Sequence, residues 1–135
     1  MTVLETQALT RKFGELIAVD AMSIAVERGE VFGLLGPNGA GKTTAIKMLT
    51  TLLPPTSGTA RVAGFDITSA ASSVRRRIGY VPQALSVDGS LTAYENLLIF
   101  AKLYDVPSAE RKTRVHDALA FMGLKDFARA YPAQL

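Results

Sequence analysis

Cysteine is absent from this 135-residue chain, and histidine occurs only once. The first absence excludes disulfide bonds, thiolate metal sites and cysteine nucleophiles. The second excludes zinc sites built from several histidines. No apolar run approaches the ~18 residues that a membrane-spanning helix needs, and the N-terminal residues lack the basic and apolar segments of a secretory signal. The net charge of +3 is too small to indicate nucleic-acid binding, because fifteen basic residues are mixed with twelve acidic ones. We therefore expect a cytoplasmic protein that binds no nucleic acid.

Apolar residues make up 48 % of the chain, which is enough to form a core. Short apolar or alternating runs predict strands at residues 3–8, 17–26, 31–35, 59–63 and 78–82. The run at 31–35 has no polar alternation, which is typical of a strand covered on both faces in a parallel sheet. Apolar periodicity predicts helices at residues 42–53, 70–77, 92–104, 107–123 and 126–130.

Two of these helices carry further information. The helix at 42–53 has so wide an apolar face that we expect it to be largely buried. The helix at 92–104 begins at Thr92, and Glu95 three residues later completes a capping box. A bend near residues 82–89 should separate the mixed N-terminal part from the helical C-terminal part.

The strongest motif lies between the predicted strand at 31–35 and the helix that follows. Residues 36–43 read Gly-Pro-Asn-Gly-Ala-Gly-Lys-Thr, which matches the phosphate-binding pattern G-x-x-x-x-G-K-[ST]. Glycines let the backbone wrap so that successive N–H groups point at one phosphate, and the helix directs its positive end to the same place. Lys42 would reach the β- and γ-phosphates, and the Thr43 hydroxyl would bind Mg²⁺. A glycine-rich turn that binds nothing is the alternative, but chance matches should occur in under ~1 % of chains of this length.

Residues 30–44 closely resemble the Walker A region of the ATPases of ATP-binding cassette (ABC) transporters. Three further segments resemble this family alone: 11–14 around the aromatic Phe13, 54–64 after the phosphate-loop helix, and 78–83, which resembles the Q-loop. The likeness runs over essentially the whole chain. In detail it is similar to the ATPase subunits that power drug and antibiotic exporters of the daunorubicin-resistance type.

The resemblance implies an α/β fold of the P-loop NTPase class, built as in ABC ATPases. Residues 1–90 would form part of a RecA-like nucleotide-binding core with an antiparallel β part. Residues 91–135 would form the start of the helical subdomain. In relatives, residues 131–135 lead into the signature motif and then into the Walker B strand, so the chain is expected to stop before both.

The same resemblance implies ATP and Mg²⁺ as ligands. Phe13 would stack on the adenine, and the alternative is an aromatic that only packs in the core or a turn. Gln83 would contact the Mg²⁺ and the attacking water. The predicted nucleotide contacts are Phe13, Gly36, Asn38, Gly39, Ala40, Gly41, Lys42, Thr43 and Thr44, and the predicted metal contacts are Thr43 and Gln83.

By resemblance, the full protein would be the ATP-binding subunit of a membrane exporter that hydrolyses ATP to drive efflux of a drug-like or lipophilic compound. Its partners would be a transmembrane permease subunit and a second copy of itself, at the inner face of the cell membrane. Two alternatives remain open, namely a truncated nucleotide-binding remnant without turnover and an ABC ATPase with no role in transport.

This chain by itself is not expected to hydrolyse ATP, because it contains no identified catalytic base. In relatives the Walker B strand pairs beside the strand at 31–35. By resemblance, residues 31–35 of this chain are therefore expected to have an unpaired edge and an uncovered apolar face. We therefore expect the chain to be poorly soluble, oligomeric or partly rearranged in its core.

Overall fold

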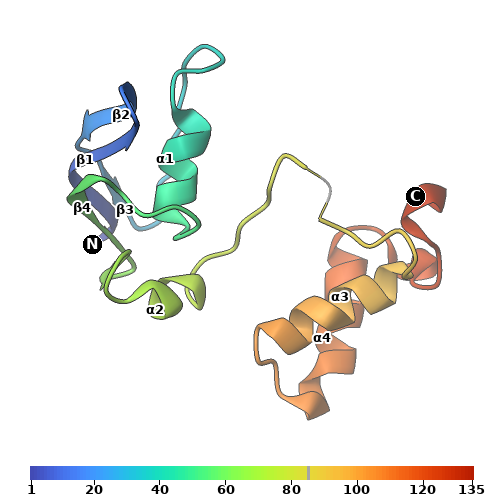
Figure 1. Cartoon of the computed structure of the whole chain (residues 1–135). Helices are drawn as coiled ribbons and strands as arrows, with labels where there is room; N and C mark the ends of the chain where they lie inside the picture. The colour runs from blue at the N-terminus through green and yellow to red at the C-terminus, as the bar shows by residue number, and fades with distance from the viewer. Residues whose placement is uncertain (85) are drawn as a thin grey trace. The chain divides into compact units, whose positions relative to one another are not determined.

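The computed structural model describes residues 1–84 and 86–135. These residues divide into two compact units, Met1–Tyr80 and Val81–Leu135 (Figure 1). The bend predicted near residues 82–89 includes residue 85, which lies outside the described residues. The functional division predicted at residue 90 stays a prediction.

The first unit is built on an antiparallel sheet (Figure 1). Its strand order is β2-β1-β4-β5, and β3 also pairs with β1. The central strand β1 is long enough to pair with β2 through residues 9–13, with β3 through residues 2–5 and with β4 through residues 4–10. The strands are β1 (Thr2–Phe13), β2 (Leu16–Met22), β3 (Ala25–Glu27), β4 (Ser57–Val62) and β5 (Phe65–Asp66).

One strand was predicted over residues 17–26, but the structure divides this stretch into β2 and β3. At the break, the Thr6 hydroxyl donates to the carbonyl of Met22 at 2.8 Å and accepts from the N–H of Ile24 at 3.0 Å. The Ser23 hydroxyl accepts from the N–H of Ala8 at 2.9 Å. Side chains therefore replace part of the backbone ladder here, and the buried polar groups keep their partners.

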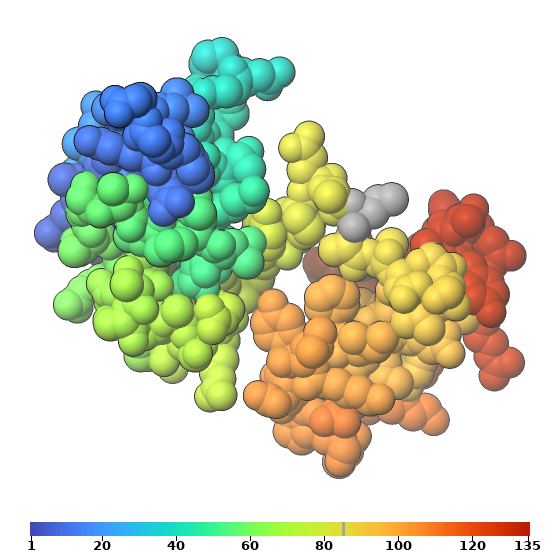
Figure 2. All heavy atoms as spheres, viewed as in Figure 1, coloured from blue at the N-terminus to red at the C-terminus, as the bar shows by residue number. Residues whose placement is uncertain are grey.

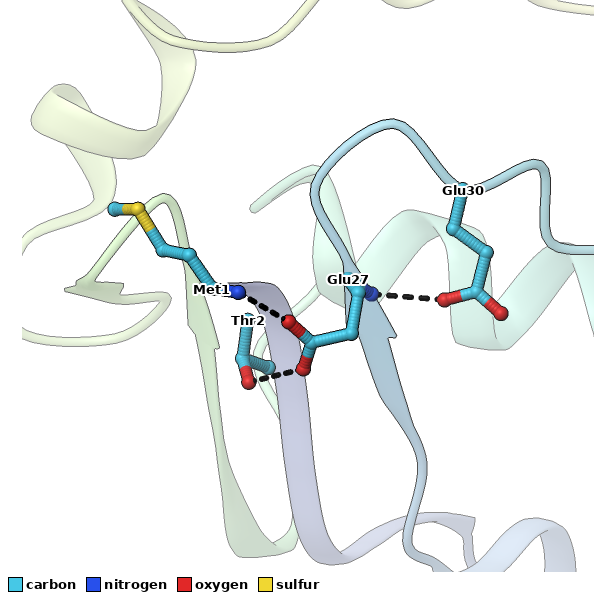
Figure 3. Close-up of polar contacts among 4 residues, drawn as sticks. All are labelled: Met1, Thr2, Glu27 and Glu30. Atoms are coloured by element: carbon cyan, nitrogen blue, oxygen red, sulfur yellow. Dashed lines mark hydrogen bonds and ion pairs between the residues drawn. The ribbon is translucent and has the colours of Figure 1, made fainter.

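The strand β3 is tied to the start of β1 by a small polar cluster (Figure 3). The Met1 amino group lies 2.6 Å from the Glu27 carboxylate, and the Thr2 hydroxyl donates to the same carboxylate at 2.5 Å. The hydrogen bond from the terminal amino group, followed by that from Thr2, lowers the pKa of Glu27. The Glu30 carboxylate accepts from the N–H of Glu27 at 2.8 Å, which holds the turn that leaves β3.

The helix α1 (Lys42–Leu49) packs against β2 and β4 (Figure 1). Its buried residues join those of the sheet and of the following segments in one apolar core, which consists of Leu9, Val19, Ala45, Met48, Leu49, Ala60, Val62, Ile67 and Val74. The short helix α2 (Ala71–Arg75) contributes Val74 to this core. The core therefore lies between the sheet and the helices that follow the phosphate motif.

The predicted extent and burial of this first helix were wrong. It was expected to reach residue 53, but it ends at Leu49, because Thr51 adopts a left-handed conformation with φ of 63°. The N–H groups of Leu52 and Leu53 then both bond to the carbonyl of Lys47. The opposite face of α1 is open, and Ile46 is 37 % exposed.

Residues 31–35 form no strand, so the predicted parallel-sheet strand was wrong. Val31 and Leu35 are 98 % and 94 % exposed, and no described strand pairs with this segment. Backbone N–H and C=O groups form a strand only where a neighbour satisfies them. The strand predicted at 78–82 is absent for the same reason, although Ile78 packs on the core. The expected effect on solubility stays a prediction.

The second unit is helical. It contains α3 (Ala93–Leu103), α4 (Ser108–Phe121) and the short 3₁₀ helices η1 (Lys125–Phe127) and η2 (Pro132–Gln134). The predicted capping box is confirmed, because the Thr92 hydroxyl accepts from the N–H of Glu95 and the Glu95 carboxylate accepts from the N–H of Thr92. In this unit Ala93, Val115 and Leu119 are buried between α3 and α4.

Among the described residues of the whole chain, no helix is both long and apolar enough to cross a bilayer.

Candidate functional site

The phosphate motif forms a loop that leads into α1 and stands out from the rest of its unit (Figures 1 and 2). Residues 36–40 are exposed along this loop. Gly39 and Gly41 adopt φ of 83° and 90°, values that L-residues with a side chain rarely adopt. The Lys42 ammonium folds back over the loop and donates to the carbonyls of Gly36 at 2.5 Å and Pro37 at 2.6 Å. The cation is thus held by the carbonyls of the first two residues of the motif.

Gly41 also fixes where α1 begins. A Cβ atom at this position would lie 2.0 Å from the carbonyl oxygen of Ala18 and 3.4 Å from a methyl carbon of Val19. Only glycine allows the backbone to come this close to β2. The start of α1 is therefore seated on the hairpin formed by β1 and β2.

The first turn of α1 has the properties of an anion site. The first intrahelical bond runs from the N–H of Ala45 to the carbonyl of Gly41, at 2.9 Å. Among the described residues, the N–H groups of Lys42, Thr43 and Thr44 have no hydrogen-bond partner, no side chain caps the helix and its first turn contains no acidic residue. Unpaired N–H groups and the positive end of the helix dipole favour a bound anion. Together with the Lys42 ammonium, these donors fit a phosphate group.

Phe13 lies at the end of β1, opposite Leu16 of β2, and 46 % of it is exposed. The guanidinium carbon of Arg11 lies 4.6 Å from the centre of the Phe13 ring. Arg11 pairs with Val19, and Val19 together with its neighbour Ala18 approaches Gly41. The end of the hairpin that carries Phe13 is therefore connected to the phosphate loop through β2. The contact of Arg11 with Phe13 was missed from sequence, where the basic residue two positions before Phe13 was the available signal.

Gln83 belongs to the second unit, where it is exposed and lies outside helices and strands. The other predicted contacts, Phe13 and residues 36–44, all belong to the first unit. The structure therefore brings the loop, the lysine and the aromatic hairpin into one unit, and the shared metal contact of Thr43 and Gln83 stays a prediction. Across residues 1–84 and 86–135, no three His, Asp or Glu side chains are grouped as metal ligands.

Two carboxyl groups with lowered pKa values, those of Asp66 and Asp88, lie in turns outside the phosphate loop. Hydrogen bonds from the N–H groups of Ser69 and then Thr68 lower the pKa of Asp66. The hydroxyl and N–H of Ser90 lower the pKa of Asp88. In each case the carboxylate accepts from residues two or three positions later, as turn residues do. We therefore assign these acids to turns.

Comparison with known proteins gives a consistent family assignment. The model of the ABC transporter family matches residues 19–135. The probable multidrug ABC transporter ATP-binding protein YbhF of Escherichia coli is 43 % identical over 127 residues, which cover 94 % of this chain and 22 % of that protein. The daunorubicin/doxorubicin resistance ATP-binding protein DrrA of Streptomyces peucetius is 45 % identical over 123 residues, 91 % of this chain and 37 % of that protein. The methionine import ATP-binding protein MetN of Brucella abortus is 40 % identical over 137 residues, 98 % of this chain and 37 % of that protein.

The fold has a counterpart among solved structures. An ATP-binding subunit of an ABC transporter matches with a TM-score of 0.85 and 29 % sequence identity, covering 99 % of this chain and 56 % of that one. The chain thus spans from about a fifth to somewhat over half of the length of the proteins that it matches.

Proposed function

The chain belongs to the ABC transporter family, and from this premise we propose that its first unit binds the phosphates of ATP at the loop of residues 36–44. The observation that carries the proposal is the position of the Lys42 ammonium, which is bonded to two carbonyls of the loop, while the first turn of α1, which begins at the same residue, has unpaired N–H groups. Both carbonyls are neutral acceptors. A phosphate oxygen is a stronger, charge-assisted acceptor and would take over the ammonium.

The remaining roles follow the chemistry of each residue. Backbone N–H groups of the loop and of Thr44 would hold phosphate oxygens, and Asn38 and Ala40 would line the loop. Mg²⁺, when bound, neutralises phosphate charge, and we propose the Thr43 hydroxyl and the Gln83 amide oxygen as its contacts from this chain. The half-exposed ring of Phe13 offers a flat apolar face to the adenine.

For the full protein we propose the ATP-driven export of a drug-like or lipophilic compound. The names of YbhF and DrrA support this direction of transport. Such a subunit would act at the inner face of the membrane with a transmembrane permease subunit and a second copy of itself. Import is the second candidate, because the import protein MetN is almost as similar. Deleting the gene and measuring the cellular retention of ethidium, a lipophilic cation, separates the two directions. Loss of an exporter of such compounds raises the retention of ethidium, whereas loss of an importer does not raise it.

The binding proposal is tested by titration calorimetry of the chain with ATP and Mg²⁺. Lys42→Ala should weaken ATP binding by about 10- to 100-fold, because a charge-assisted hydrogen bond contributes about 1.5–3 kcal/mol. Lys47→Ala is the matched control, since Lys47 lies on the same helix, is exposed and carries the same charge. Its affinity for ATP should stay within about twofold of wild type. Equal ATP affinity for the wild-type chain and Lys42→Ala would overturn the assignment of the loop.

A further inference from the structure

Arg11 makes a set of contacts that its place on a strand end does not require. Its guanidinium carbon lies 4.6 Å from the centre of the Phe13 ring. One terminal nitrogen, Nη1, donates to the carbonyl of Pro54 at 2.8 Å. The Nε atom is buried and has no hydrogen-bond partner among the described residues. A buried N–H without a partner is unfavourable for folding, so fold stability by itself is a poor reason for this arrangement.

The backbone around Arg11 is fixed as well. The N–H of Thr56 donates to the carbonyl of Thr10 at 2.8 Å, and the Thr56 hydroxyl accepts from the N–H of Lys12 at 2.9 Å. These bonds hold the end of β1 against the segment that follows α1, on both sides of Arg11. The guanidinium is planar and anchored at Pro54, so its orientation is set independently of the Phe13 ring.

This anchoring has a consequence for the ring. A phenylalanine at the exposed end of a hairpin would otherwise sample several side-chain orientations. A guanidinium stacked on one face holds the ring by cation–π attraction and leaves the other face for a ligand. Because 46 % of Phe13 remains exposed, part of the ring is available for such contact.

We propose that Arg11 is a positioning residue that holds Phe13 as a platform for the flat base of a nucleotide. The ligand would be a nucleoside triphosphate whose base stacks on Phe13 while its phosphates lie in the loop at Lys42. The inference rests on the proposed function, since it assumes that phosphates bind at that loop. Stacking tolerates any base, so the platform contributes affinity for a heteroaromatic ring and little preference for adenine over guanine.

The test compares ATP with inorganic tripolyphosphate, which has the phosphates and lacks the base. Both are titrated with Mg²⁺ against the 135-residue chain. Arg11→Ala should weaken ATP binding about fivefold and leave tripolyphosphate binding unchanged, because only the base is affected. Phe13→Ala should weaken ATP binding about tenfold, again without effect on tripolyphosphate. In the Phe13→Ala background, Arg11→Ala should cause no further loss.

Two further variants separate charge from shape. Arg11→Lys keeps the charge and loses the planar group. It should therefore weaken ATP binding and leave the affinity for tripolyphosphate unchanged. It also covers the case in which Arg11→Ala does not fold. Lys12→Ala removes the same charge from the neighbouring exposed residue, and it should change the affinities for ATP and for tripolyphosphate by the same factor.

Each contrary result has a definite meaning. Equal weakening of ATP and tripolyphosphate by Arg11→Ala would overturn the inference, because Arg11 would then act through charge. Tighter ATP binding by Arg11→Ala would also overturn it, because Arg11 would then be competing with the base for the ring. Additive losses in the double variant would do the same. A wild-type chain that binds tripolyphosphate as tightly as ATP would refute the platform alone, whereas one that binds neither would overturn the proposed function and the platform with it.

Discussion

Replacing Gly41 by alanine should separate the start of α1 from strand β2. The added Cβ atom would lie 2.0 Å from the carbonyl oxygen of Ala18, far inside ordinary contact distance, so the two backbones must move apart. Alanine would also be strained at a φ of 90°. The left-handed conformation costs about 1–2 kcal/mol, and overpacking typically costs about 1–3 kcal/mol. We therefore expect about 2–5 kcal/mol of destabilisation in the first unit.

Gly39 provides the matched control. Its φ is 83°, close to that of Gly41, but a Cβ atom there would meet nothing within 4 Å. Gly39→Ala should therefore cost only the conformational strain, about 1–2 kcal/mol. The difference between the two variants measures the contact with β2 and excludes the general effect of placing alanine in a left-handed conformation.

Hydrogen exchange measured by mass spectrometry is the suitable assay. The chain has two compact units, so a single unfolding transition is not assured, whereas amide exchange reports each segment separately. Gly41→Ala should reduce protection of residues 42–49 and 16–22 and leave residues 93–121 unchanged. If Gly41→Ala and Gly39→Ala lost the same protection in α1 and β2, the contact with Ala18 would not be what seats the helix.

Two further predictions concern the helical unit. Asn96 is buried, its side-chain oxygen accepts from the N–H of Asp88 at 2.8 Å, and its two amide hydrogens are shared among the carbonyls of Asp88, Leu91 and Thr92. Asn96→Ala should therefore cost about 2 kcal/mol and speed amide exchange in residues 88–92; unchanged exchange there would contradict the role of this side chain. The N–H and then the hydroxyl of Thr92 lower the pKa of Glu95, so its stabilising effect is present above its usual pKa of 4.5 and is lost as the pH falls through the lowered value. Thermal unfolding followed by circular dichroism between pH 7 and 3 should show this loss in wild type and a smaller one in Glu95→Gln, and identical pH profiles would contradict it.

Features that depend on a few neighbouring residues could be predicted from the sequence. The start of α3 is an example, because the capping box needs only Thr92 and Glu95, three positions apart. The start of α1 at Lys42 follows in the same way from the phosphate motif, whose glycines supply the required backbone conformations. Both helix starts are indicated by residue types a few positions apart, whereas the packing of α1 against β2 depends on the distant Ala18.

Strand formation could not be predicted in the same way. Residues 31–35 have the composition of a buried strand, yet Val31 is 98 % exposed and pairs with no described strand. Apolar composition favours burial, but a strand also needs a partner for its backbone groups, and no described strand supplies one for residues 31–35, as their expected unpaired edge implied. The exposure of Ile46 on α1 has a similar origin, since the sheet covers only one face of the helix.

The features of the candidate site also fall into those set by short sequence patterns and those set by tertiary contacts. The sequence by itself determined the family and the phosphate motif. It also led to the prediction of Lys42, Thr43 and Phe13 as ligand contacts, because each was chosen by residue type at a short, fixed spacing. Only the tertiary structure decided that Arg11 stacks on Phe13 and bonds to Pro54, 43 positions later in the chain. It also decided that Gly41 meets the backbone of Ala18. These contacts join segments that a spacing pattern cannot relate, since their distance depends on how the hairpin, α1 and the following turn pack together.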